Sequence, residues 1–259
     1  MKIVSLNTQG RDLDSTNLLN MVTCNADGRP DDFDLILLQR CTKSFLASLL
    51  SRSPNKTFMN WDGTSLHSAW TPAMPDNSSD QGLAIVSIRP VEQLIAHRVD
   101  LDYDKTDPHQ CNVYQSFVYK GLRLINFLPP YTPDGVEYEY LDKLLQEDVD
   151  VMVGDCHNNY RNSDVHPKKF YNYRVANTMT NYADGRLHEN DANTKQLTWL
   201  FLRNEVINRM DNTWTLEVDL ERVAHRTQEQ GHSASLFNIV MKPTGLGRTL
   251  NPGVDNDPS

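Results

Sequence analysis

The stretch Asp34-Leu35-Ile36-Leu37-Leu38-Gln39-Arg40 decides the fold class. Its continuous apolar run is typical of a β-strand buried on both faces, as in sheets that other elements cover on each side. Comparable short apolar runs lie at 1–6, 82–88 and 149–154, and segments with helical apolar spacing lie between them. This alternation predicts an α/β protein.

The remaining segments extend the same pattern. A hairpin is expected where Lys120-Gly121 separates two apolar runs. We expect two successive sheet halves with helices outside them, packed as a two-layered sandwich in one domain over 1–247. Loops are expected over 52–80, around a short strand near Phe58, and over 157–195, and the tail 248–259 is expected to be disordered. Further strands are predicted at 94–99, 111–119, 122–128, 197–202 and 235–241. Three helices are predicted. The first starts at Asp14 or Ser15 and carries Leu18, Leu19 and Val22 on one face, and the other two span 45–50 and 136–146.

Composition narrows the function. The chain has 259 residues, of which 39% are hydrophobic, so it can bury a sizeable core. Its net charge of −9 disfavours nucleic acid as a partner without excluding it, because phosphates repel an acidic surface. No secretory signal or membrane-spanning run is recognisable, so no membrane partner is expected. The scattered cysteines Cys24, Cys41, Cys111 and Cys156 are typical of free thiols, so we expect an intracellular, reducing compartment.

Five segments, in this order, resemble the landmarks of the endonuclease/exonuclease/phosphatase (DNase I-like) superfamily. They are Val4–Gly10, Leu35–Arg40, Gly82–Val91, Val151–Asp155 and Gly231–Ala234. The resemblance implies a sandwich of two packed mixed β-sheets flanked by helices. It also implies metal-dependent phosphate chemistry, in which a Glu after Gln holds Mg²⁺, a Gly-Asp-x-Asn segment positions water and phosphate, and a final His moves a proton.

Several residues depart from that pattern. Asn7, Asp155 and His232 are retained, and these are the candidate catalytic positions. Arg40 stands where the resemblance places the metal-binding Glu, and a guanidinium would repel Mg²⁺. The other substituted positions are Phe127 for a phosphate-contacting His or Tyr, His157 for the Asn of Gly-Asp-x-Asn, Thr198 for a carboxylate, and Gly231 for the Asp before the final His.

Alternatives stay open for these residues. Arg40 either pairs with Asp155 or binds a phosphate or a partner's carboxylate. In the third alternative Arg40 is wrongly aligned with the metal-binding Glu, and another acid such as Asp12 or Asp14 serves. Asn7 and Asp155 could instead have a structural role at the strand ends. A new zinc site from Asp155, Cys156, His157 and His232 would match no standard spacing, and satisfied polar histidines are the other interpretation.

Three hypotheses for function follow. The first is a non-catalytic module, without a cofactor, that binds a protein partner. The second is a divergent Mg²⁺- or Mn²⁺-dependent endonuclease or phosphodiesterase with a rearranged site. The third is a nucleic-acid-binding module that does not cleave. The candidate binding patch combines basic and aromatic residues, Lys168, Lys169, Tyr171, Tyr173 and Arg174.

Overall fold

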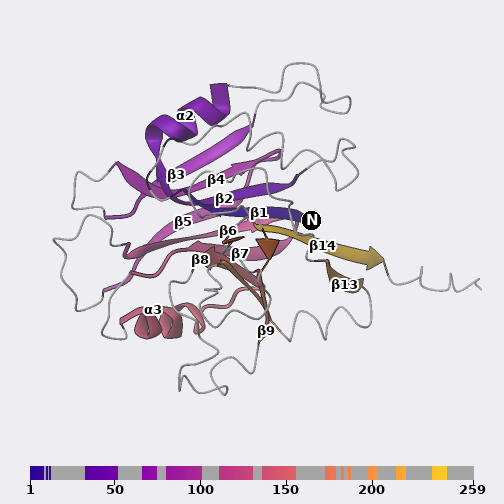
Figure 1. Cartoon of the computed structure of the whole chain (residues 1–259). Helices are drawn as coiled ribbons and strands as arrows, with labels where there is room; N and C mark the ends of the chain where they lie inside the picture. The colour runs from indigo at the N-terminus through magenta and orange to yellow at the C-terminus, as the bar shows by residue number, and fades with distance from the viewer. Residues whose placement is uncertain are drawn as a thin grey trace, which may run out of the picture.

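Two β-sheets packed face to face form the molecule, with helix α2 outside one sheet and helix α3 outside the other (Figure 1). The computed structural model describes residues 1–8, 10, 12, 33–51, 66–74, 80–100, 111–130, 136–155, 173–178, 182–183, 186–187, 198–203, 214–219 and 235–243. For 136–138, 173–178, 182–183, 186–187, 198–199, 214–219 and 235–243 only the backbone is described.

Sheet 1 has six strands, in the order β13-β14-β1-β2-β4-β3. Strands β1 and β2 pair in parallel, and the other described pairs are antiparallel. The sheet is therefore mixed. Its strands are β1 (Lys2–Asn7), β2 (Leu35–Thr42), β3 (His67–Pro72), β4 (Gln81–Ser87), β13 (Trp214–Asp219) and β14 (Ser235–Pro243).

Sheet 2 also has six strands, in the order β5-β6-β7-β8-β12-β9. Here β7 and β8 are the parallel pair. A two-stranded ribbon, β10 (Tyr182–Ala183) with β11 (Arg186–Leu187), is separate. The predicted sandwich of two mixed sheets is confirmed. The strands of sheet 2 are β5 (Glu92–Arg98), β6 (Val113–Tyr119), β7 (Leu122–Phe127), β8 (Val151–Asp155), β9 (Tyr173–Thr178) and β12 (Thr198–Arg203).

Strand alternation distributes the apolar side chains over three layers. Residues of both sheets, including Ile3, Leu37, Leu124 and Val153, meet in the inter-sheet layer. The opposite faces of the strands pack under the helices. Phe45 of α2 (Lys43–Ser51) packs in one cluster with Val4, Leu6, Ile36 and Leu38, and Tyr140 of α3 (Val136–Leu144) packs in another with Ile125, Phe127, Met152 and Phe201.

Helix α2 begins at a side-chain cap. The backbone N–H of Phe45 donates to Thr42 Oγ1 at 3.0 Å, which satisfies a donor that the first helical turn leaves open. Asp12 accepts hydrogen bonds from Thr42 Oγ1 at 2.6 Å and from Ser44 Oγ at 2.8 Å. Each described helix has nine residues, and none of the described helices is long and apolar enough to cross a membrane.

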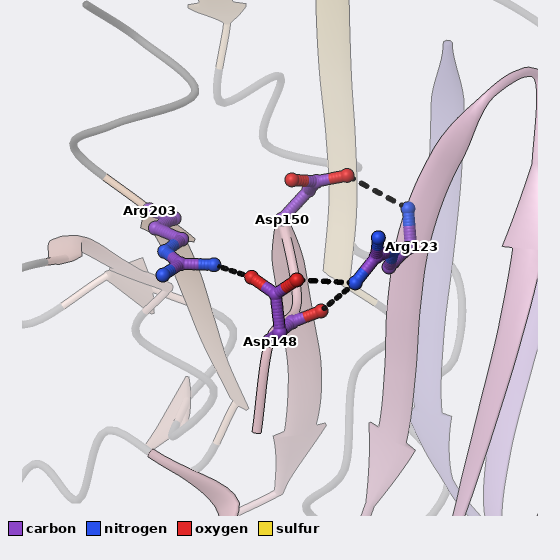
Figure 2. Close-up of polar contacts among 4 residues, drawn as sticks. All are labelled: Arg123, Asp148, Asp150 and Arg203. Carbon is purple, nitrogen blue, oxygen red and sulfur yellow. Dashed lines mark hydrogen bonds and ion pairs between the residues drawn. The ribbon is translucent and has the colours of Figure 1, made fainter. Parts of the chain in front are cut away.

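Two polar clusters lie at the ends of the sheets where β1, β2 and β8 begin. Asp34 lies 2.5 Å from Lys120 Nζ and accepts from the backbone N–H of Lys2 at 2.8 Å, so it joins the start of β2 to the β6–β7 turn. Figure 2 shows Asp148 between Arg123 of β7 and Arg203 of β12. A hydrogen bond from Arg203 and the positive charge of Arg123 hold the pKa of Asp148 below its ordinary value.

Some elements differ from those predicted from the sequence. A strand lies at β3, whereas Phe58 falls outside the described residues. The prediction of loops throughout 157–195 is wrong for β9, β10 and β11, and β13 was not predicted. Strand β9 is an edge strand that pairs only with β12, and an edge strand needs no continuous apolar run. The predicted first helix and the tail 248–259 lie outside the described residues.

Candidate functional site

The carboxyl ends of β1 and β8 meet between the two sheets. Asn7, the last residue of β1, donates from Nδ2 to Asp155 Oδ2 at 2.5 Å, and Asp155 is the last residue of β8. Both side chains are buried, with 5% of Asn7 and 1% of Asp155 exposed. A buried carboxylate needs hydrogen bonds or positive charge to offset its lost hydration. The structure thus brings together two retained candidate residues that are 148 positions apart.

Arg40 follows Gln39, which is the register partner of Asn7 on β2. The β2–β4 pairing shifts by one residue between Leu38 and Cys41, and Arg40 has a φ of 50° in this bulge. Its carbonyl accepts hydrogen bonds from Thr8 Oγ1 at 2.7 Å and from Gly10 N at 3.0 Å. The chain that leaves β1 after Asn7 is therefore bound to the backbone of Arg40. We call Asn7, Arg40 and Asp155 the sheet-end site.

The positive charge of Arg40 affects a buried thiol, that of Cys111. Cys111 is fully buried with Leu83, Val113 and Leu128, and burial raises the pKa of its thiol to about 12. The positive charge of Arg40 works against that rise. The pairing of Arg40 with Asp155 stays a prediction.

Phe127 lies on the other face of sheet 2. Its ring is fully buried in the cluster under α3, with its centroid 6.1 Å from that of Phe201. Gly154, its register partner on β8, makes room for it: a Cβ on Gly154 would lie 2.3 Å from the Phe127 carbonyl oxygen. Strand alternation turns the Phe127 side chain away from the sheet-end site and into the core under α3. Its assignment to a substituted site position stays a prediction.

Other predicted site residues are only partly described. Asp12, proposed as a substitute acid, is exposed, and its hydrogen bonds from Thr42 and Ser44 lower the pKa of its carboxyl. Thr198 is the register partner of Asp155 at the start of β12, which places its backbone beside the site. Tyr173 and Arg174 lie in β9, a strand of which the structure describes the backbone alone. Asp14, Cys156, His157, Lys168, Lys169, Tyr171, Gly231 and His232 lie outside the described residues.

The donor chemistry at the sheet-end site consists of one amide, one carboxylate and one guanidinium. Divalent cations such as Mg²⁺ prefer several hard oxygen ligands. In the described part of the chain, no three His, Cys, Asp or Glu side chains lie together in a way that could hold a metal ion. The described residues of the site therefore do not fit a divalent cation.

Sequence reasoning missed a chain of buried polar side chains beside this site. Gln39 Nε2 donates to Asn126 Oδ1 at 2.9 Å, Asn126 Nδ2 donates to Gln115 Oε1 at 3.0 Å, and Gln115 Nε2 donates to Thr71 Oγ1 at 2.9 Å. Gln39 Nε2 also donates to Ser5 Oγ at 3.2 Å. We call Ser5, Gln39, Thr71, Gln115 and Asn126 the buried amide layer. Its signal in the sequence is a polar residue at an inward position of an apolar strand, as in Leu122-Arg123-Leu124-Ile125-Asn126.

The comparisons with known proteins bear on the fold. No protein-family model and no curated protein matches the sequence. Many solved structures resemble this chain, and the following three do so over nearly its whole length. An endonuclease/exonuclease/phosphatase family protein from Leptotrichia buccalis has 11% identity and a TM-score of 0.57, over 93% of this chain and 99% of its own. A functionally unknown conserved protein from Enterococcus faecalis has 9% identity and a TM-score of 0.61, over 93% and 100%. The human Nocturnin catalytic domain has 12% identity and a TM-score of 0.51, over 93% and 94%.

This likeness agrees with the arrangement of the strands in two packed sheets. At these identities it establishes the architecture and leaves the activity to the residues themselves. The chain is a highly divergent protein with the fold of the endonuclease/exonuclease/phosphatase family.

Proposed function

We propose that this chain is a non-catalytic derivative of the phosphodiesterase fold that serves as a binding module for a protein partner. The observation that carries the proposal is the sheet-end site itself. Its one described carboxylate, on Asp155, is buried and accepts a hydrogen bond from Asn7, and Arg40 stands beside these strand ends. A carboxylate that is hydrogen-bonded within the protein and shielded from solvent is poorly placed to orient a water or a metal.

Electrostatics supports the same conclusion. Replacing a metal-binding Glu by Arg changes the local charge by two units. Two unit charges about 4 Å apart interact by about 4 kcal/mol near a protein surface. A divalent cation near the Arg40 guanidinium would be repelled by a comparable or larger amount, so phosphate chemistry would lose the charge stabilisation that a metal supplies.

Two residues of the candidate binding patch, Tyr173 and Arg174, lie on a strand whose start is far from the sheet-end site. In the β9–β12 register Thr178 faces Thr198, whereas Tyr173 faces Arg203. Tyr173 and Arg174 therefore begin β9 at the end of sheet 2 that also carries Asp148 and Arg203. We place the protein-binding surface at this end, because aromatic and arginine residues are frequent anchors of protein interfaces and the net charge of −9 disfavours nucleic acid.

A hydrolysis assay tests the proposal. Wild type, Asp155→Ala and the matched control Asp100→Ala, an exposed aspartate, are incubated with DNA, RNA and bis(p-nitrophenyl) phosphate in Mg²⁺ or Mn²⁺. We expect all three proteins to give the background rate. Hydrolysis by wild type and by Asp100→Ala, but not by Asp155→Ala, would contradict the proposal.

That outcome would establish the second hypothesis, a phosphodiesterase with a rearranged site. The observation in its favour is that Asn7 and Asp155 still meet at the strand ends. Binding of nucleic acid without cleavage would show as an affinity that falls steeply with salt, measured by fluorescence anisotropy. A protein partner is tested by cross-linking wild type and a Lys168→Glu/Lys169→Glu/Arg174→Glu variant in cell extract, where the variant should lose the cross-linked species.

A further inference from the structure

Two polar bridges join the sheets side by side near the sheet-end site. One is the hydrogen bond between Asn7 of β1 and Asp155 of β8. The other is the hydrogen bond between Gln39 of β2 and Asn126 of β7. Asn7 and Gln39 are register partners in sheet 1, and Asn126 faces Val153, two residues before Asp155, in sheet 2. The Gln39–Asn126 bridge therefore also holds β1 and β8, the strands that carry Asn7 and Asp155, through their neighbours β2 and β7.

Asn126 is held in one orientation from several directions. Its Oδ1 accepts from Gln39, and its Nδ2 donates to Gln115 Oε1 at 3.0 Å and to the backbone oxygen of Ala84 at 3.2 Å. Gln39, Gln115 and Asn126 are all fully buried. The two amide groups of a Gln39–Asn126 pair can satisfy each other at one separation and one relative alignment, because hydrogen bonds weaken steeply with distance and angle.

Apolar side chains would hold the sheets together about as well. Elsewhere in the inter-sheet layer residues such as Ile3, Leu37 and Leu124 do so. Burying amides carries a desolvation cost that their hydrogen bonds only slightly exceed, so the net stability gained from them is small. An amide pair adds a fixed alignment of the two sheets. Apolar contacts allow one sheet to slide over the other, whereas a hydrogen bond weakens when its distance or angle changes.

We propose that Asn126, together with Gln39, is a positioning residue of the sheet-end site. Its hydrogen bond across the sandwich sets the spacing and alignment of β1–β2 against β7–β8, and so brings the Asn7 amide onto the Asp155 carboxylate. This inference is independent of the proposed function, because it concerns the geometry of the site whether or not a metal or substrate binds there.

The test follows the side-chain amide of Asn7 by ¹⁵N NMR of the full chain, with the signal assigned by its loss in Asn7→Leu. A hydrogen bond to a carboxylate moves one of the two amide protons downfield. Asn126→Leu removes the positioning bridge from sheet 2, and Gln39→Met removes it from sheet 1 with a side chain of similar length. Leu124→Ala is the matched control, because it opens a cavity in the same strand and inter-sheet layer but leaves both bridges in place.

We expect Asn126→Leu and Gln39→Met each to move the Asn7 signal upfield toward the position of exposed amides, and the double variant to move it no further. Leu124→Ala should lower the melting temperature and leave the signal unchanged. The proposal is overturned if the bridge variants leave the signal in place, or if Leu124→Ala moves it equally. It is also overturned if both bridge variants lose the near-UV circular dichroism of the fold while Leu124→Ala keeps it, since the layer would then be needed for folding as a whole.

Discussion

At Gly154 two neighbouring strands approach so closely that no side chain fits between them. A Cβ there would lie 2.3 Å from the Phe127 carbonyl oxygen and 2.7 Å from two carbons of its ring. We predict that Gly154→Ala lowers the free energy of unfolding by about 1–3 kcal/mol, because backbone and a buried ring must move to admit the methyl group. Urea denaturation followed by circular dichroism measures the change.

Gly121→Ala separates crowding from backbone strain. Gly121 has a φ of +77° in the β6–β7 turn, and a Cβ there would have no neighbour within 4 Å. Its substitution should cost only the left-handed backbone penalty, about 1–2 kcal/mol. If Gly154→Ala proves as stable as wild type, β7 and β8 do not pack as closely as the structure shows.

The same strands show which site residues the sequence could place and which it could not. Asn7 and Asp155 were predicted at one site from the resemblance of their segments to the superfamily's landmarks, and in the structure the ends of these two strands do meet. The side-chain direction of Phe127 was not predicted. Phe127 alternates with Asn126, and both faces of sheet 2 are covered, so the sequence alone does not tell which of the two points toward sheet 1. The buried amide layer was missed because its members come from five strands and their hydrogen bonds are not encoded in any local pattern.

At the scale of an element, α2 depends on one hydroxyl. Thr42 Oγ1 accepts from Phe45 N and donates to Asp12. We predict that Thr42→Ala destabilises the protein by about 1 kcal/mol, the usual cost of losing an N-cap. Thr42→Ser keeps the hydroxyl and should recover most of that loss in a urea titration. Equal destabilisation by both substitutions would show that the methyl group, and not the cap, matters.

Strands β7, β8 and β12 are joined at their other end by a charged cluster. Asp148 binds both Arg123 and Arg203 (Figure 2), and these contacts lower the pKa of its carboxyl. A lowered folded-state pKa adds stability above the unfolded value, about 3.9, and that contribution disappears as the pH falls through the folded-state pKa. We therefore predict that wild type exceeds Asp148→Asn in stability at pH 5–8 and that the difference shrinks below about pH 4.

The difference should be small and should decrease with added salt, because Asp148 is largely exposed. Melting temperatures of the two proteins across this pH range, at low and high salt, provide the measurement. A difference that grows toward acid pH would show that the carboxylate destabilises the folded state.

At the scale of the whole molecule, the sequence predicted the sandwich because its central strands are continuous apolar runs. Strands β1, β2, β4 and β8 lie within a few residues of their predicted positions, and α2 and α3 cover the outer faces as expected. The edge strands β9 and β13 were missed, because an edge strand is not enclosed on both sides and its sequence need not be apolar throughout.

Contacts at several levels join the two sheets, from the start of β2 to the sheet-end site, and together they hold the geometry of that site. Asp34 and Lys120 join them where β2 begins. The apolar inter-sheet layer and the buried amide layer follow. Asn7 and Asp155 join them at the sheet-end site. The strand ends can therefore stay in place with Arg40 at the position where the resemblance places a metal-binding Glu.

We propose that Arg40 makes the sheet-end site reject the divalent cation that the resemblance implies there. Isothermal titration calorimetry with Mg²⁺ and Mn²⁺ tests it most directly, on wild type, Arg40→Gln and Arg40→Glu. Arg40→Gln removes the positive charge without adding a ligand, and Arg40→Glu adds one. We predict no binding by wild type, little or none by Arg40→Gln, and saturable binding by Arg40→Glu. Saturable binding by wild type that Asp155→Ala abolishes would contradict the claim, and the hydrolysis assay would then show whether the bound metal supports catalysis.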